Sequence, residues 1–389
     1  MIKNIKLRYI LNSNAEKAIE ADVFLTDGYF GRGASPAAIV PGIREKRITE
    51  KKKEDLLKEE KKLKDFLINR SINQMQLDEC LRILVDEIGT DITIAVSIAF
   101  ARATASSRKI EMVEYLCREL KIKKEFKLPY ILVAVFSGGV HSKSEMKSFQ
   151  QIMACIRGLD LEHSYNLSKD ISEKIEVKLR KKGNTFTIGA SGGYVVDCLS
   201  TKEKICLLQE IITENDYGNY VSIAIDVAAE HLKKGEKYLF EGQFICAEDF
   251  LKIIEQYINE FELSYVEDPF DTKDTKQWKE IKESCGKYTY IIGDDLFATQ
   301  ETFLDNNLAD GIVIKMNQVG NLTDTLKAIV KAKRERMRIC VSHRSKETED
   351  TTMCDLAIAS QAEYVKIGGI RRGERLIKYN QLLRLSEVL

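Results

Sequence analysis

Apolar and polar positions follow two different rhythms along the chain, and the change between them divides it into two parts. Residues 3–11 and 18–33 alternate with the period of two that is typical of strands in a meander. Residues 44–65 place leucines at helical spacing among lysines and acidic residues, which predicts a solvated helix. Residues 92–107 are apolar nearly all round, which predicts a buried helix. We therefore predict an α+β domain over residues 1–127.

Short apolar runs separated by helical segments fill residues 128–389, which we predict to be a second domain. The runs are residues 130–136, 184–190, 220–226, 263–268, 288–295, 310–317, 338–343 and 363–369. Segments between them, such as residues 247–261 and 321–336, have the 3.6-residue period of amphipathic helices. Strands that alternate with helices favour a β/α barrel, with a doubly wound sheet as the competing arrangement.

Composition excludes several classes of function. The 389 residues are 44% hydrophobic with only 4 Pro, as expected of a folded protein with a large core. Sixty Lys and Arg balance sixty Asp and Glu, so no overall field would draw the chain to nucleic acid or to a membrane. Nine cysteines without a C-x-x-C pair are typical of free thiols. We expect a cytoplasmic protein that binds neither nucleic acid nor a membrane.

Six of the late apolar runs stop at an ionisable residue. These residues are Asp226, Glu267, Asp294, Lys315, His343 and Lys366. In a β/α barrel the carboxyl ends of the strands converge on one mouth, where active sites lie. Three carboxylates from separate strands suit a hard cation such as Mg²⁺, and a lysine beside such a cation has a lowered pKa that suits a base.

Residues 189–193 contain the pattern Gly-x-Ser-x-Gly, with Ser191 at its centre. In hydrolases this pattern is a strained turn that presents a nucleophilic serine. The chain order Ser191, Asp294, His343 is also that of one class of hydrolase triad. A serine hydrolase is therefore one hypothesis for the function.

Longer motifs carry a resemblance to a known family. The segments SIAIDVAAE, YVEDPF, GDDLFAT, IVIKMNQVGNLTDTL, VSHRSKETEDTT and VKIGGIRRGERLIKYNQLLRL together resemble enolase, the 2-phosphoglycerate dehydratase of glycolysis. The resemblance runs almost end to end and is densest after residue 222. It implies an enolase-type β/α barrel behind the α+β domain, a Mg²⁺ cofactor, and a homodimer or a multiple of dimers.

The resemblance assigns roles position by position. Asp226, Glu267 and Asp294 match the metal ligands of the family. Lys315 matches the base that removes the proton from C2 of the substrate, and Lys366 matches the lysine that helps to hold the substrate carboxylate.

Substrate contacts follow from the same comparison. Arg344 and Ser345 match a phosphate clamp, for which guanidinium geometry is well suited. Gln150 matches a glutamine that contacts the substrate. Because Asp294 and His343 fall in enolase motifs, they weigh against the hydrolase hypothesis.

The four histidines divide into two pairs. His141 and His343 fall in family motifs and match active-site histidines. His163 and His231 match no motif, and we expect them to be ordinary helix or surface residues.

The chain departs from the family on one side of the site. The family turn Gly-Asp-Glu-Gly-Gly supplies a glutamate that protonates the departing 3-hydroxyl, and here Ser191 stands in its place. Gln151 replaces a second family glutamate. In the lid segment 37–42, Val40 replaces a serine associated with a second metal ion, so we expect one Mg²⁺ site. Residues 12–17 likewise depart from the family motif.

These losses suggest three functions besides the hydrolase. The first is formation of a metal-stabilised enolate from a phosphorylated or phosphonylated carboxylate, with an altered second step, as in relatives such as carboxyphosphonoenolpyruvate synthase. The second is a working phosphopyruvate hydratase whose proton comes from His141, His343 or water. The third is an inert paralogue that binds a ligand or partner. We favour the first, because only the half of the site that expels hydroxide is lost.

Overall fold

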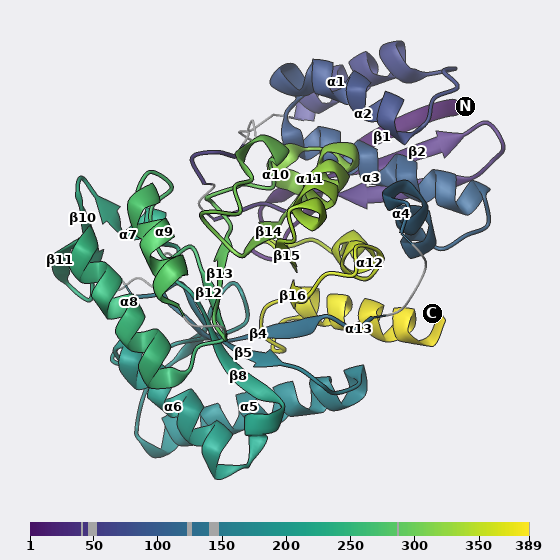
Figure 1. The fold of residues 1–389 in the computed structure, drawn as a ribbon. Helices are drawn as coiled ribbons and strands as arrows, with labels where there is room; N and C mark the ends of the chain where they lie inside the picture. Colours follow the sequence, from purple (N-terminus) through teal and green to yellow (C-terminus); the bar gives the residue numbers. More distant parts are fainter. Residues whose placement is uncertain (40–41, 46–52, 123–126, 140–147, 286–287, 389) are drawn as a thin grey trace.

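The computed structural model describes residues 1–39, 42–45, 53–122, 127–139, 148–285 and 288–388. A small first domain lies beside a larger barrel domain (Figure 1). The small domain contains the strands β1 (Ile2–Leu11), β2 (Lys17–Leu25) and β3 (Phe30–Ala34), and the helices α1 (Lys53–Leu67), α2 (Gln74–Ile88), α3 (Thr90–Ser107) and α4 (Met112–Leu120). The three strands form an antiparallel sheet in chain order, so the predicted meander is confirmed.

The buried helix of the small domain is α3, which lies directly on β3. A side chain at Gly31 or Gly33 would collide with the backbone of Ala99 or Ala95, so these glycines allow the helix to approach the strand closely. Most residues of α3 are buried, as the sequence predicts. The predicted solvated helix is α1, although residues 46–52 of that lysine-rich run lie outside the described residues.

Eight strands form a closed barrel in the second domain. They are β4 (Tyr130–Ser137), β5 (Gln151–Ile156), β8 (Val221–Asp226), β12 (Tyr265–Glu267), β13 (Tyr290–Gly293), β14 (Gly311–Ile314), β15 (Arg338–Ser342) and β16 (Tyr364–Lys366). Pairing of β16 with β4 closes the sheet, which rules out the doubly wound alternative. The strands are parallel except β5, which runs antiparallel to β4 and β8.

One predicted barrel strand is wrong. Residues 184–190 contribute only β6 (Thr187–Ile188), which forms a short hairpin with β7 (Tyr194–Val195) at the edge of the sheet. The segment QIMACI, which is buried throughout, provides the barrel strand β5 instead. A continuous apolar run can be covered on both faces, whereas the glycines of residues 189–193 make a turn.

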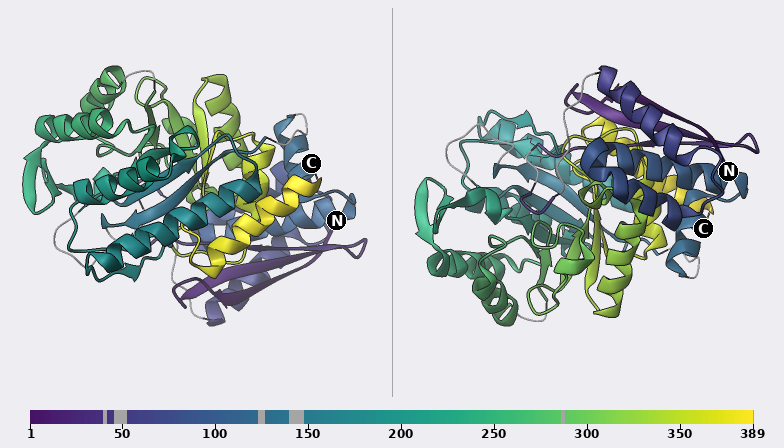
Figure 2. Two further views of the ribbon diagram at one scale, coloured as in Figure 1. Left: turned by 90° about the horizontal axis from the view of Figure 1, so that it is seen from below. Right: turned by 90° about the horizontal axis from the view of Figure 1, so that it is seen from above.

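Helices cover the outside of the barrel. They include α5 (Leu161–Lys181), α6 (Thr201–Glu214), α8 (Ala247–Phe261), α9 (Thr275–Ser284), α11 (Leu322–Arg334), α12 (Thr352–Ala359) and α13 (Gly373–Val388). Figure 2 shows α5 lying between α6 and α13 along one side of the barrel. In the part of the chain that the structure describes, no helix is long and apolar enough to cross a membrane.

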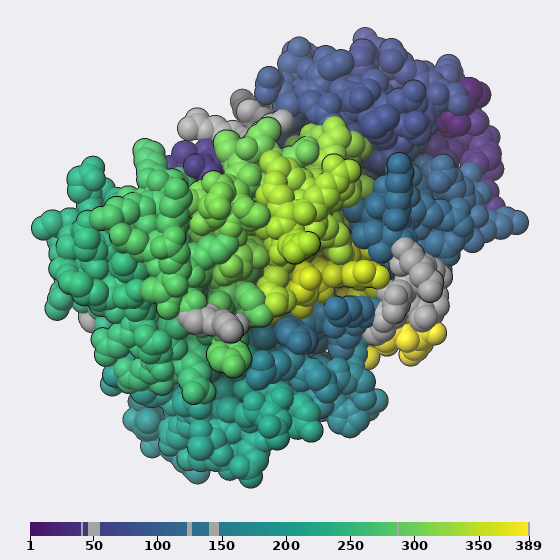
Figure 3. All heavy atoms as spheres, viewed as in Figure 1, coloured from purple at the N-terminus to yellow at the C-terminus, as the bar shows by residue number. Residues whose placement is uncertain are grey.

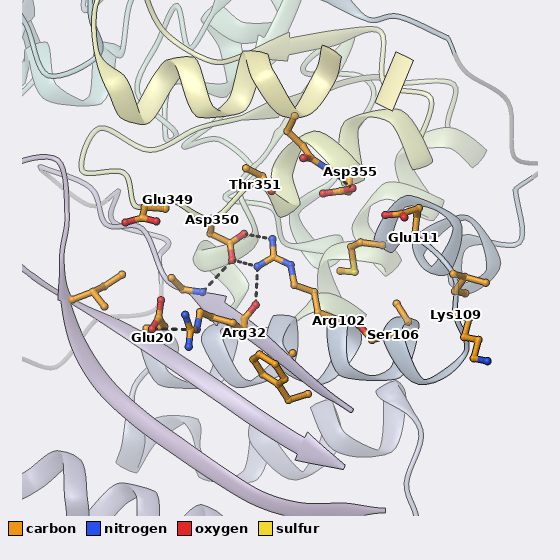
Figure 4. A pocket seen from close by; sticks show the side chains of 18 residues that line it. Glu20, Arg32, Arg102, Ser106, Lys109, Glu111, Glu349, Asp350, Thr351 and Asp355 are labelled. Atoms are coloured by element: carbon orange, nitrogen blue, oxygen red, sulfur yellow. Dashed lines mark hydrogen bonds and ion pairs between the residues drawn. The ribbon is translucent and has the colours of Figure 1, made fainter. Parts of the chain in front are cut away.

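Buried polar contacts join the two domains, which form one continuous body (Figure 3). The Asp78 carboxylate on α2 accepts hydrogen bonds from the Ser97 hydroxyl at 2.7 Å and from the Thr323 backbone and hydroxyl on α11 at 2.8 and 2.6 Å. Nearby, Arg102 on α3 pairs with Asp350 at 2.7 Å beside a cleft of about 730 Å³ (Figure 4). The boundary predicted after residue 127 stays a prediction.

Candidate active site

The six ionisable residues predicted at strand ends converge on one mouth of the barrel. Asp226 and Glu267 are the last residues of β8 and β12 and are paired in register. The other four follow or end the next strands around the barrel: Asp294 after β13, Lys315 after β14, His343 after β15 and Lys366 at the end of β16. A cavity of about 50 Å³ opens at this mouth. The arrangement follows from parallel strands whose carboxyl ends share one edge.

Ion pairs link the lysines to the carboxylates. The Lys366 ammonium donates to Asp226 Oδ2 at 2.7 Å and to Glu267 Oε1 at 2.8 Å, and all three side chains are buried. Lys315 forms an ion pair with Asp294. Burial is the largest single influence on the pKa of Lys315 and lowers it, but the negative charges around it, Asp294 first and then Glu267, raise it, and the resulting pKa is above its usual value.

Negative charge exceeds positive charge at this mouth, which favours a cation. The carboxylates are those of Glu45, Asp226, Glu267, Asp294 and Asp295, five against the three cations Lys315, Arg344 and Lys366. Burial and the charge of Asp226 raise the pKa of Glu267 to about 7, and burial and the charge of Asp294 raise the pKa of Asp295. Carboxylate oxygens with surplus charge are the donors that Mg²⁺ prefers, so the residues present fit this ion.

Among the described residues, the carboxylates that cluster tightly enough for one ion are not the predicted set Asp226, Glu267 and Asp294 but a second set that shares Asp294. Ligand oxygens of Asp268, Asp294 and Asp295 lie within 4.8 Å of one another. However, the two oxygens of Asp268 accept the backbone N–H groups of Asp294 at 2.8 Å and Asp295 at 2.7 Å. Asp268 thus holds the turn that carries the other two residues, and we do not count it among the candidate metal ligands.

The predicted phosphate clamp meets residues of the first domain. Both oxygens of Glu45 accept from the Arg344 Nη2 atom, at 2.7 and 2.9 Å, and both side chains are buried. The Ile39 backbone N–H donates to the Ser345 hydroxyl at 2.8 Å. Among the described residues, the other amino group of Arg344, Nη1, makes one long hydrogen bond, to Asn317 Oδ1 at 3.5 Å. Donors on one edge of the guanidinium therefore remain for a ligand.

Ser191 and Gln151 lie side by side and both line the cavity. The Gln151 amide donates to the Ser191 hydroxyl at 3.4 Å, and the two side chains are 4% and 1% exposed. The turn that carries Ser191 is rigid: Gly192 has a φ of 86°, and the Gly369 N–H donates to the Ser191 carbonyl at 2.7 Å. Neither side chain is a carboxylic acid, so neither supplies a proton readily near neutral pH.

His343 is held in one protonation state by its neighbours. Arg375 Nη1, which can only donate, lies 2.6 Å from His343 Nδ1, and the Arg344 carbonyl, which can only accept, lies 3.0 Å from the same nitrogen. Burial and the charges of Arg375 and Lys366 lower the pKa of His343 well below its usual value. His343 is therefore a neutral imidazole near neutral pH. A neutral imidazole is a poor general acid.

Two family models match the chain and together cover most of it. The model described as enolase, N-terminal domain, matches residues 2–116, and the model described as enolase, C-terminal TIM barrel domain, matches residues 125–389. The chain belongs to the enolase family. A small domain of strands and helices followed by a closed eight-stranded barrel is the organisation that the two models describe.

Most of the residues predicted from the enolase motifs lie together. Gln150 donates to Asp226 Oδ2 at 3.1 Å, which places it beside the candidate metal ligands. His141 and Val40 lie outside the described residues. The hydrolase hypothesis finds no geometric support in the described residues, because Ser191 pairs with Gln151 and the Nδ1 atom of His343 pairs with Arg375.

Sequence reasoning overlooked several residues of this enolase-family site. His231 was expected to be an ordinary helix or surface residue; it lies on a helix, and it also lines the cavity. The signal was its place on α7 (Ala229–Leu232), directly after β8, because the loops after barrel strands line the mouth. Glu45 and Arg375 were also overlooked. His163, by contrast, is exposed at the start of α5, where its N–H donates to Asp160 at 2.8 Å.

Proposed function

We propose that this enolase-family protein removes the C2 proton of a 2-phosphoglycerate-like carboxylate to give an enolate, and that its second step differs from the loss of water. The substrate is a phosphorylated or phosphonylated carboxylate that is altered at or beyond C3. Chemistry of the carboxyphosphonoenolpyruvate synthase kind is one example of such a second step. The coarser assignment, an enzyme of the enolase superfamily, rests on the family matches.

The intact half of the site supports the first step. Arg344 and Ser345 would hold the phosphoryl group through the guanidinium edge and the hydroxyl that face the cavity. Lys315 would take the C2 proton, and Lys366 would hold the carboxylate. Asp226, Glu267 and Asp294 would hold Mg²⁺, which supplies positive charge to stabilise the enolate and to draw Asp294 away from Lys315.

The proposal of a changed second step rests on the half of the site in which the family glutamates are replaced. Ser191 and Gln151, the residues at the two glutamate positions of the family, are neutral and bonded to each other. His343, which lines the same cavity, is held neutral by burial and by the charges of Arg375 and Lys366. Loss of a general acid typically slows a step by about 10²–10⁴-fold. Elimination of hydroxide would therefore be slow, whereas abstraction of the C2 proton would not be affected.

The neutral wall also bears on the substrate. Two carboxylates near C3 would repel an anionic substituent, and an amide and a hydroxyl do not. The amide oxygen of Gln151 is buried and has no hydrogen-bond partner among the described residues, so it is free to accept a bond from a ligand. The present cavity is small, about 50 Å³, and Glu45 occupies one amino group of Arg344, so a phosphoryl group that takes both amino groups would displace Glu45.

Hydrogen exchange at C2 tests the first step. The protein would be incubated with Mg²⁺ and 2-phosphoglycerate in deuterated water, and loss of the C2 proton signal followed by NMR. We expect exchange with the wild type, its loss in Lys315→Met, and its retention in Lys327→Met, which alters an exposed lysine of α11. Exchange that survives Lys315→Met would contradict the assigned base. No exchange in the wild type would count against 2-phosphoglycerate itself and would leave a different substrate or an inert paralogue.

A further inference from the structure

A tyrosine inside the barrel touches a candidate metal ligand from behind. Tyr265 and Glu267 are two residues apart on β12, so their side chains point to the same face, the interior of the barrel. Both residues are fully buried. The Tyr265 hydroxyl donates a hydrogen bond to Glu267 Oε2 at 2.8 Å. The Cys340 side chain of β15 lies against the same hydroxyl.

The two oxygens of Glu267 consequently have different partners. Oε1 faces the mouth, where it accepts from Lys366 at 2.8 Å, and Oε2 faces the interior, where it accepts from Tyr265. An incoming cation can replace an ammonium at Oε1. It has no comparable access to Oε2, because the tyrosine and the apolar interior cover that side. Glu267 is thus set to offer a single oxygen in a fixed direction.

We propose that Tyr265 is a positioning residue for the metal site: its hydroxyl fixes the Glu267 carboxylate so that Oε1 points at the cation. The inference rests on the proposed function only in that Glu267 binds a divalent cation. Groups that hold metal ligands in place typically change metal affinity by about 10–100-fold when they are removed. Without the hydroxyl, Oε2 would be a buried charged oxygen with no partner, and the carboxylate would be free to rotate.

Tyr364 provides a matched control within the same cluster. Its ring meets the Tyr265 ring edge-on with centroids 5.1 Å apart, and it is almost fully buried on β16. Its hydroxyl makes no hydrogen bond to another described residue. Tyr364→Phe therefore removes the same atom from the same layer of the barrel without touching Glu267.

Calorimetric titration with Mg²⁺ tests the inference on wild type, Tyr265→Phe and Tyr364→Phe, each in the full-length protein without substrate. We expect the dissociation constant to rise about 10–100-fold in Tyr265→Phe and less than twofold in Tyr364→Phe. Thermal unfolding in the absence of metal would show whether both variants are folded, since a general packing defect would lower both midpoints alike.

Three results would overturn the inference, and they differ in what else they exclude. Equal Mg²⁺ affinity in Tyr265→Phe and wild type would sink the positioning role and leave the proposed function intact. Failure of the wild type itself to bind Mg²⁺ would sink the metal site and the positioning role together. Equal weakening in Tyr265→Phe and Tyr364→Phe would show that packing of the tyrosine layer, and not the hydrogen bond to Glu267, controls the affinity.

Discussion

Restoring a carboxylic acid at position 191 should restore elimination. Ser191 is 1% exposed and sits on a turn fixed by the Gly369 N–H and by Arg375, which donates to the Ala190 carbonyl at 2.8 Å. In Ser191→Glu, the new carboxyl group would point into the cavity from the same rigid turn, next to the Gln151 amide. Burial raises the pKa of a carboxyl group, so this glutamate would be protonated over part of the neutral range.

The size of the effect follows from the role of a general acid. Such a group contributes about 10²–10⁴-fold, and the lower end applies here because Gln151 and not a second glutamate remains beside it. We expect phosphoenolpyruvate formation from 2-phosphoglycerate to rise about 100-fold in Ser191→Glu. The rate of C2 exchange should change little, because Lys315, the proposed base, follows β14 and is left unaltered by the substitution.

Phosphoenolpyruvate formation can be followed by its ultraviolet absorbance, with Ser191→Gln as the control. The glutamine has the shape of the glutamate but no acidic proton. Elimination that rises in the glutamate variant alone would support the reasoning. The reasoning is refuted if both variants behave like the wild type while their C2 exchange persists, since the missing acid would then not be what limits elimination.

Three further outcomes are expected. Burial raises the pKa of Asp355 to about 7, so the unfolded chain loses this proton at a lower pH than the folded chain does. The free energy of unfolding should therefore fall between pH 4 and 7, by up to roughly 4 kcal/mol more in the wild type than in Asp355→Asn. Urea titrations at several pH values would measure this difference. His231 lines the cavity, and an anionic ligand favours its protonated form, so His231→Gln should weaken 2-phosphoglycerate binding severalfold at pH 6 and less at pH 8, measured by calorimetry. A Cβ on Gly192 would lie 3.0 Å from the Gly369 backbone, whereas Gly158 has a similar φ and open space around it. Gly192→Ala should therefore destabilise the protein by more than Gly158→Ala, and an equal loss of stability would contradict the close packing of the turn.

Local pattern was enough to predict much of the site. An apolar run that stops at Asp226 or Lys366 marks both the strand and its functional end, because the two signals are adjacent in sequence. The buried helix α3 was equally readable from its composition. The pair Tyr265 and Glu267 was also within reach, since residues two apart on a strand share a face.

Other features depend on contacts that no local pattern encodes. Glu45 and Arg344 are 299 positions apart in the chain, and only the docking of the two domains brings them together. The strand β5 is hard to recognise in the sequence because it begins with Gln151, which matches a residue of the substrate site. Residues 184–190 resemble a strand, but the glycines that follow turn the chain after only two strand residues. Arg375 acts on His343 from a helix whose function the sequence does not reveal.

The central claim is that C2 proton abstraction is retained and elimination is not. The most direct test measures both rates in one sample of wild-type protein, Mg²⁺ and 2-phosphoglycerate in deuterated water, with NMR signals for the C2 proton and for phosphoenolpyruvate. The neutral Ser191, Gln151 and His343 predict that exchange exceeds elimination by about 100-fold or more. Elimination that keeps pace with exchange would contradict the claim and identify a working phosphopyruvate hydratase that takes its proton from His141 or from water.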